Sequence, residues 1–322
     1  ETAPPVLPLR FYLFADGLHV VDAMDPYARL VGGRVTRVGG QPVGEVVRRV
    51  SALAPKDSQA TVPLWLPRFL VMPEVYSGLG ITPPGGQVSL TVQEGGERPR
   101  TVRVGTVSQA DYLDWIGGHH GFFLPPARPG VRWLSRVGEP FWFARIPGRR
   151  ALYVQYNQVA GPTQDEVEAV LAAAGSGVDR LVVDLRHNLG GDNTRYGAFV
   201  DALRTSPLNR PGRLYLLVGR ATFSAAANFA TTMDRRTRAT FAGEPTGGGV
   251  NQYGETREVR LERLPIPLLV PVPTEYVEAG GPGDRRLTIT PELPVRLRAA
   301  DYFAGRDPVL AAVLARPVTP GS

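Results

Sequence analysis

Two short segments of the chain combine residue types that could act on a ligand. The first, Asp184–Asn193, contains the pair Gly190 and Gly191 shortly after an apolar stretch. Two adjacent glycines let bare backbone N–H groups approach a ligand closely. A glycine pair that merely turns the chain explains the same residues equally well, so this segment alone does not define a binding site.

The second segment, Ala221–Ala227, surrounds Ser224 with small residues. A serine at the start of a helix could attack a substrate carbonyl. The N–H of Ala225 and the helix dipole would then favour negative charge on the carbonyl oxygen. The alternative is that Ser224 only caps the helix, because serine is among the residues most favoured at that position.

The elements that would position both segments alternate between strand and helix from Phe141 onward. Strands are predicted at 151–156, 181–185, 214–218 and 239–241, and a helix follows each of the first three. The first of these helices begins with a capping box between Thr163 and Glu166 and ends at Gly175. Three such units in succession predict an α/β domain, in which ligands bind beyond the carboxyl ends of the strands.

The first hundred residues have a different pattern. β-Forming stretches at 9–14, 18–22 and 34–38 are separated by glycine turns, and valines at helical spacing predict a helix over 43–53. Residues 88–93 and 101–104 alternate like a hairpin. We therefore expect a small, partly open barrel, followed by a connection over 108–140 that is rich in glycine and proline.

Composition excludes several classes of function. The 322 residues are 43% hydrophobic and 20% charged, with no cysteine and a net charge of +6, as in a globular protein of about two domains. The arginine pairs are scattered, which argues against a nucleic-acid partner. No apolar run is long enough for a membrane span. No cofactor or metal is expected, because no His, Asp or Glu group has ligand spacing and the glycines at 247–249 lack the lysine of a phosphate loop.

The order of several motifs resembles that of the tail-specific (C-terminal processing) serine peptidases, in particular their tricorn-core-like bacterial branch. The motifs span nearly the whole chain: a PDZ-like segment at Gly33–Val43, the turns Asp184–Gly191 and Phe223–Ala226, the segment Gly243–Gly248, and the tail segments Pro291–Val295 and Gly305–Leu310.

This resemblance implies a PDZ-like peptide-binding domain at 1–107, a linker at 108–140 and a crotonase-like α/β peptidase domain at 141–322. It implies a secreted, periplasmic or cell-envelope protein that hydrolyses peptide bonds through an acyl-enzyme on Ser224. The Ala225 N–H and the Gly190 and Gly191 backbone match the oxyanion hole of the family. The PDZ-like module would capture a peptide or protein substrate by β-augmentation, with the peptide terminus in the turn Asp16–Gly17–Leu18.

The catalytic base departs from the family pattern. Members with a Ser-Lys dyad have a lysine about where Gly249 stands, whereas Lys56 is the only lysine of this chain. The tricorn-like members have a histidine just before the PDZ strands, and we expect that an upstream segment absent from this sequence carries it. Within the sequence, His187, His119 and His120 are the alternative bases, and His19 is expected to be structural. Glu255 is a candidate acidic partner, as are Glu275 and Glu278.

Two other functions stay open at this stage. One is a non-catalytic protein that binds a hydrophobic ligand or a peptide, because the interphotoreceptor retinoid-binding proteins share this domain architecture and a serine without a base is a weak nucleophile. The other is an acyl-CoA enzyme of the crotonase type, against which the PDZ-like segment argues.

Overall fold

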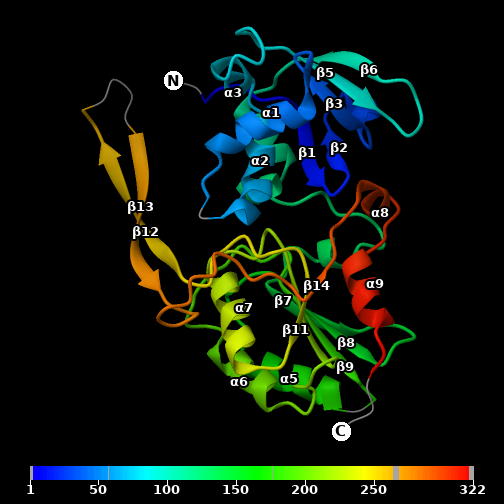
Figure 1. The fold of residues 1–322 in the computed structure, drawn as a ribbon, viewed down its shortest axis with the longest axis vertical. Helices are drawn as coiled ribbons and strands as arrows, with labels where there is room; N and C mark the ends of the chain where they lie inside the picture. Colours follow the sequence, from blue (N-terminus) through cyan, green and yellow to red (C-terminus); the bar gives the residue numbers. More distant parts are fainter. Residues whose placement is uncertain (1–2, 57, 176, 264–267, 319–322) are drawn as a thin grey trace. The chain divides into compact units, whose positions relative to one another are not determined.

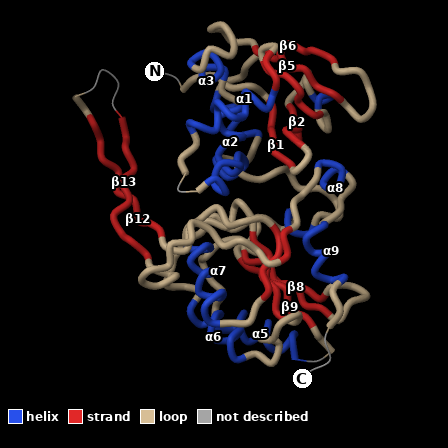
Figure 2. The backbone as a smooth tube through the Cα atoms, in the orientation of Figure 1, coloured by secondary structure: helices blue, strands red, loops and turns tan. Residues whose placement is uncertain are grey.

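The computed structural model describes residues 3–56, 58–175, 177–263 and 268–318. The chain divides into two compact units. The first comprises residues 1–137 and 294–316, and the second comprises 138–293 and 317–322. Sheets and helices occur in the chain as expected, so the fold is mixed α/β (Figure 2).

The first unit differs in extent from the domain expected at 1–107. Most of the expected linker and a segment near the end of the chain belong to it. The physical reason is an apolar cluster in which both segments pack against the first two strands: Tyr12, Phe14, Val21, Trp133, Leu134, Leu297 and Tyr302.

The first unit is built on an antiparallel sheet with the strand order β1-β2-β3-β5-β6, and β4 pairs with β3. The strands expected at 9–14, 34–38 and 88–93 are confirmed, the one expected at 18–22 is one residue longer at each end, and the one expected at 101–104 begins one residue earlier. Their bounds are β1 Leu9–Phe14, β2 Gly17–Ala23, β3 Arg34–Val38, β4 Gln41–Pro42, β5 Val88–Gln93 and β6 Arg100–Val104.

Helices accompany this sheet. The expected helix begins at Val43 and continues as a 3₁₀ turn to Leu53. Helix α2 is not predicted by the sequence because it contains two prolines: Pro63 lies in the first turn, where a missing N–H is tolerated, but Pro67 lies inside the helix. The bounds are α1 Val43–Val50, α2 Val62–Leu70, α3 Pro73–Gly78, α4 Gln109–Trp115, α8 Ala299–Phe303 and α9 Pro308–Ala315.

The second unit contains a sheet with the order β14-β11-β10-β9-β8-β7. Strands β8 to β11 are parallel, and β7 is antiparallel to β8. The strands are β7 Phe141–Arg145, β8 Ala151–Tyr156, β9 Arg180–Asp184, β10 Leu214–Val218, β11 Thr240–Gly243 and β14 Leu293–Pro294. The helices are α5 Gln164–Gly175, α6 Gly197–Thr205 and α7 Ala225–Arg236.

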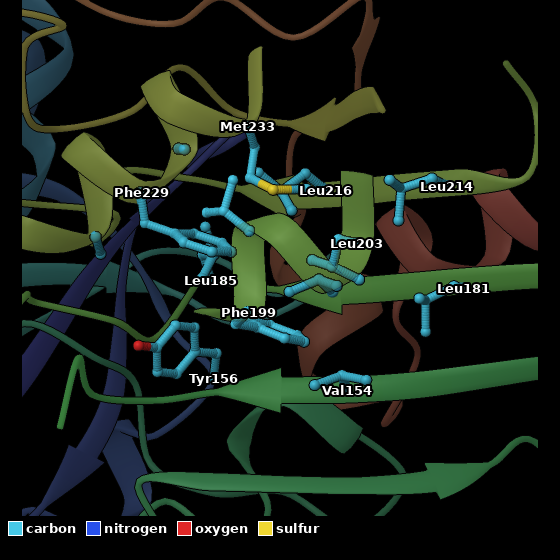
Figure 3. Packing of buried hydrophobic residues seen from close by; sticks show 14 of the residues in the cluster. Val154, Tyr156, Leu181, Leu185, Phe199, Leu203, Leu214, Leu216, Phe229 and Met233 are labelled. Carbon is cyan, nitrogen blue, oxygen red and sulfur yellow. The ribbon is translucent and has the colours of Figure 1, made fainter. Parts of the chain in front are cut away.

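The sequence predicts these α/β units because each strand is mostly apolar and each helix carries an apolar stripe. Strands β8, β9 and β10 are buried at every position. Figure 3 shows Tyr156 of β8 and Leu216 of β10 packed with Phe199 of α6 and Phe229 of α7. The capping box is also confirmed, since Glu166 accepts a hydrogen bond of 2.7 Å from the Thr163 N–H.

A long two-stranded ribbon also belongs to the second unit. It consists of β12, Gln252–Leu261, and β13, Leu268–Val277, which pair antiparallel. The ribbon projects from the sheet and helices of its unit (Figure 1). No local pattern in the sequence predicts this ribbon.

Candidate active site

The two segments that sequence analysis selected lie at the carboxyl ends of neighbouring parallel strands. Asp184–Asn193 begins at the end of β9, and Ala221–Ala227 follows β10 and runs into the first turn of α7. The loop after β11, Glu244–Asn251, is the next turn along the same edge. In a parallel sheet covered by helices, this edge is where ligands bind.

Hydrogen bonds join the three turns to one another. The Phe223 N–H donates to the Asn188 carbonyl over 3.1 Å, and the Gly248 N–H donates to the Thr222 carbonyl over 3.1 Å. The buried Thr222 hydroxyl donates to the Leu185 carbonyl over 3.0 Å. The turns therefore form one connected structure around the start of α7.

Ser224 occupies the N-terminal cap position of α7 but does not act as a cap. Its backbone has φ 51° and ψ −129°, and its side chain makes no capping hydrogen bond. Positive φ is disfavoured for a residue with a Cβ, and such strain costs on the order of 1–3 kcal/mol. The capping alternative therefore does not account for this serine.

Gly190 lies directly against Ser224. A Cβ at Gly190 would lie 2.7 Å from the Ser224 Cβ and 3.0 Å from the Ala225 nitrogen. Gly190 also has φ +115°, and Gly191 has φ +145°. A Cβ added at Gly191 would lie only 2.3 Å from the Val159 carbonyl oxygen. Both positions therefore require glycine, and the glycine pair does more than turn the chain.

The backbone N–H groups near Ser224 differ in their availability. The Gly190 N–H donates to the Asn188 Oδ1 over 2.9 Å, and the Asn188 Nδ2 in turn donates to the Tyr156 carbonyl over 2.8 Å. Within the described residues, the N–H groups of Gly191 and Ala225 donate no hydrogen bond. The Ala225 N–H also stands at the positive end of the α7 dipole.

A chain of side-chain amides supports the Ser224 backbone, and the sequence analysis missed it. Gln252 Nε2 donates to the Ser224 carbonyl and to Asn228 Oδ1, each over 3.0 Å. Asn228 Nδ2 donates to Asn193 Oδ1 over 2.8 Å. The available signal is the four-residue spacing of Ser224 and Asn228, which puts a second polar residue on the same helix face, one turn after the serine.

Two ion pairs, one buried and one largely buried, stabilise the same edge of the sheet. The Asp184 Oδ2 and Arg186 Nη2 atoms lie 2.6 Å apart, and the two side chains are 1% and 8% exposed. The Tyr153 hydroxyl also donates a hydrogen bond to Asp184 Oδ2 over 2.7 Å. Arg220 and Glu244 lie 2.9 Å apart and link the turn after β10 to the loop after β11. Buried pairs such as these are costly to break, because the remaining charge lacks a partner.

The four histidines fall in different places. His187 is half-buried in the turn that carries Gly190. His19 lies on β2 of the first unit, where its Nδ1 contacts the Gly32 carbonyl over 3.2 Å and burial lowers its pKa. His119 and His120 begin a 3₁₀ helix of the first unit, and their side chains lie outside the described part of the structure.

The remaining candidates lie on other elements of the chain. Glu255 is exposed on β12 with φ 46°. Asp16–Gly17–Leu18 forms the hairpin between β1 and β2, with Phe14 paired to Gly17. Asp16 Oδ1 accepts a hydrogen bond from the Ala299 N–H over 3.0 Å. The turn thus has the geometry of an ordinary β-hairpin.

Other kinds of site receive no support from the described residues. Among them, no group of three or more His, Cys, Asp or Glu side chains is arranged to hold a metal ion. No helix within the described ranges has the length and apolar character needed to cross a membrane.

Comparison with solved structures identifies the fold. Mature CPAF in complex with lactacystin matches with a TM-score of 0.61 and 16% identity over 94% of this chain and 80% of that chain. A second structure of mature CPAF matches with a TM-score of 0.58 and 14% identity over 92% and 79% of the two chains. The photosystem II D1 C-terminal processing protease matches with a TM-score of 0.37 and 15% identity over 98% and 78%. No family model and no curated protein sequence matches.

The chain therefore has the fold of mature CPAF. The structural neighbours also include a C-terminal processing protease, a putative S41 protease and a putative peptidase, with TM-scores of 0.37, 0.38 and 0.41 and identities of 15%, 16% and 15%.

Proposed function

We propose that this chain is a serine-type peptidase in which Ser224 attacks peptide bonds of unfolded proteins or peptides. The observation that carries the proposal is the strained Ser224 backbone, held against Gly190 with its side chain free of a capping role. Strain of this kind persists only where the surrounding structure enforces it, and it clusters at active sites. The sequence resemblance to the tail-specific proteases supports the same activity.

The chemistry is an acyl transfer in two steps. Ser224 Oγ forms a bond to the carbonyl carbon as its proton passes to a base, and the carbonyl oxygen becomes an oxyanion. The C–N bond then breaks, the leaving amine takes up the proton, and an ester on Ser224 remains until water hydrolyses it. This is nucleophilic catalysis, which replaces one difficult step by two easier ones.

The oxyanion hole in this proposal consists of the Gly191 and Ala225 N–H groups. Both lack an acceptor among the described residues, and Ala225 adds the α7 dipole. Gly190 contributes its shape, because its own N–H is held by Asn188 and its missing Cβ leaves room for Ser224. Loss of one such donor typically lowers the rate by about 10²-fold or more.

His187 is the proposed base, because it lies in the same turn as Gly190. His119 and His120 are the alternatives. Replacement of His187 by glutamine should slow acylation of Ser224 and leave the Ser224 backbone unchanged. Normal acylation after this replacement would assign the base to another residue.

The two units have separate roles in the proposal. A PDZ-like module within residues 1–107 would bind an extended substrate, and a crotonase-like domain within 141–322 would cleave it. The turn Asp16–Gly17–Leu18 would take the peptide terminus. Export to the cell envelope is part of the same proposal, and cell fractionation would test it.

The test of this function is hydrolysis of fluorescein-labelled casein, which is an unfolded protein. The chain should release labelled peptides, and Ser224→Ala should abolish their release. The matched control is Ser206→Ala, because Ser206 follows α6 and its hydroxyl only accepts a hydrogen bond from the Leu208 N–H. Binding of casein without cleavage would contradict the peptidase and favour the non-catalytic binding protein.

A further inference from the structure

The ribbon formed by β12 and β13 exposes an apolar face. In the antiparallel register, Tyr253 lies opposite Tyr276, and Val259 lies opposite Val270. Because side chains alternate between the two faces of a strand, all exposed large apolar side chains of the ribbon except Leu269 lie on one face. They are Tyr253, Val259, Leu261, Leu268, Val270, Val272 and Tyr276. Glu255, Arg257 and Thr274 share this face between the two tyrosines and the other apolar side chains.

This face has no covering element in the described part of the chain. Tyr253 is 66% exposed and Leu268 is 49% exposed. Strands β12 and β13 make extended contact only with each other among the described elements. A lone two-stranded ribbon is marginally stable in water. We therefore expect the exposed apolar face of this ribbon to be covered by a binding partner.

The two edges of the ribbon differ in their capacity to pair with another strand. Pro271 and Pro273 of β13 lie opposite Glu258 and Thr256. Proline has no N–H, so these pairs cannot exchange hydrogen bonds across the ribbon, and their backbone groups point outward. The outer edge of β13 therefore lacks donors at both prolines. The outer edge of β12 presents the N–H and carbonyl groups of Thr256, Glu258 and Arg260.

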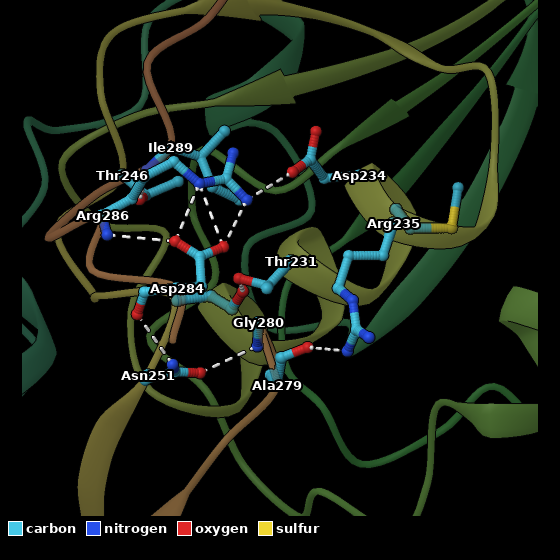
Figure 4. Close-up of polar contacts among 12 residues, drawn as sticks. Thr231, Asp234, Arg235, Thr246, Asn251, Ala279, Gly280, Asp284, Arg286 and Ile289 are labelled. Atoms are coloured by element: carbon cyan, nitrogen blue, oxygen red, sulfur yellow. Dashed lines mark hydrogen bonds and ion pairs between the residues drawn. The ribbon is translucent and has the colours of Figure 1, made fainter. Parts of the chain in front are cut away.

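The ribbon is joined to the candidate active site at its base. Gln252, the first residue of β12, donates to the Ser224 carbonyl. Asn251, just before β12, accepts a hydrogen bond from the Gly280 N–H over 2.9 Å and donates one to the Asp284 carbonyl over 2.9 Å, as Figure 4 shows, and both partners follow β13. Arg286 connects Asp284 to Asp234 of α7. A ligand on the ribbon would thus extend toward Ser224.

The dimensions of the face argue against a second copy as its occupant. Ten residues per strand correspond to a length of about 33 Å, and two strands correspond to a width of about 10 Å. Two such faces in contact would bury about 660 Å² in total. A stable dimer interface typically buries about 1,200–2,000 Å².

We propose that the outer edge of β12 binds an extended, apolar segment of an unfolded polypeptide as a third strand, next to the candidate active site. Main-chain hydrogen bonds to Thr256, Glu258 and Arg260 hold the segment. Every second side chain of the segment then lies on the apolar face of the ribbon and extends it. The inference deepens the proposed function, because it identifies where the substrate binds outside the cleavage site.

The test measures binding separately from cleavage. The probe is fluorescently labelled, reduced and carboxymethylated α-lactalbumin, and its binding to the full chain carrying Ser224→Ala is followed by fluorescence anisotropy. Added to this background, Glu258→Pro removes one outward N–H from the β12 edge and should weaken binding about tenfold. Leu269→Pro is the matched control, because it removes an outward N–H from the β13 edge, and binding should stay within about twofold.

A second pair of variants tests the face without changing the backbone. Val259→Lys should weaken binding of the probe about tenfold, because Val259 lies on the apolar face of β12 itself, whereas Leu269→Lys, on the opposite face, should not. Unchanged binding in Glu258→Pro and Val259→Lys would overturn the inference. So would a dimer in sedimentation velocity that Glu258→Pro dissociates, since this would identify a second copy as the occupant.

The outcome can be separated from that of the proposed function. Acylation of Ser224 by a fluorophosphonate does not need the ribbon. If the adduct forms and the ribbon variants bind normally, the inference fails and the peptidase stands. If no adduct forms and binding depends on the β12 edge, the ribbon site is supported and the peptidase is overturned.

Discussion

Replacement of Gly190 by alanine is expected to disable the candidate active site while the sheet behind it remains folded. The new Cβ would lie 2.7 Å from the Ser224 Cβ and 3.0 Å from the Ala225 nitrogen. Carbon atoms in ordinary contact are about 3.5 Å apart, so Ser224 and the glycine turn must separate by about 0.8 Å.

Two effects follow from this displacement. A misplacement of about 1 Å in a catalytic group lowers the rate by about 10²-fold, so we expect casein hydrolysis and fluorophosphonate labelling to fall by this factor. The alanine must also adopt φ +115°, and the resulting strain should lower the free energy of unfolding by about 1–3 kcal/mol.

The assay compares Gly190→Ala with Gly197→Ala by labelling rate and by urea unfolding. Gly197 is the first residue of α6 and has open space around its Cβ direction, so its replacement should leave labelling unchanged and stability the same or slightly higher. Equal labelling rates in the two variants would refute the reasoning that Gly190 and Ser224 form one site.

Three further variants test other parts of the account. Ser224→Gly should be more stable to urea than Ser224→Ala by about 1 kcal/mol, because only glycine tolerates φ 51° without strain; the reverse order would contradict the strained backbone. Arg220→Met should lower the free energy of unfolding by about 2 kcal/mol, because it removes the ion pair of Glu244, whose side chain is only 16% exposed, and the further change Glu244→Gln should restore more than half of the loss. Burial lowers the pKa of His19, so the unfolded state binds more protons, and stability should be complete above about pH 6.5 and decline as the pH falls below it. His19→Gln should flatten this decline in urea titrations from pH 7.5 to 5, and an unchanged slope would exclude His19 as its origin.

The sequence predicts the α/β unit well because its signals are local. The apolar strands β8 to β10 are buried on both faces, and the capping box at Thr163 starts α5. The proximity of Gly190 and Ser224 could also be expected, since turns at the carboxyl ends of adjacent parallel strands meet at one edge.

Other features depend on contacts that no local pattern encodes. The segment 294–316 belongs to the first unit because Leu297 and Tyr302 pack with Phe14, nearly three hundred residues earlier in the chain. The amide chain from Gln252 to Asn193 is likewise formed by residues from three separate segments. The ribbon escaped prediction because its prolines at 271 and 273 are unusual in strands, and only the register shows that they lie on an edge.

The central claim is that Ser224 is the nucleophile of the site. Its most direct test is intact-mass analysis of the folded chain after incubation with a fluorophosphonate. The account predicts one adduct per chain, mapped to Ser224 and absent from Ser224→Ala. A chain that acquires no adduct, or an adduct that persists in Ser224→Ala, would contradict it.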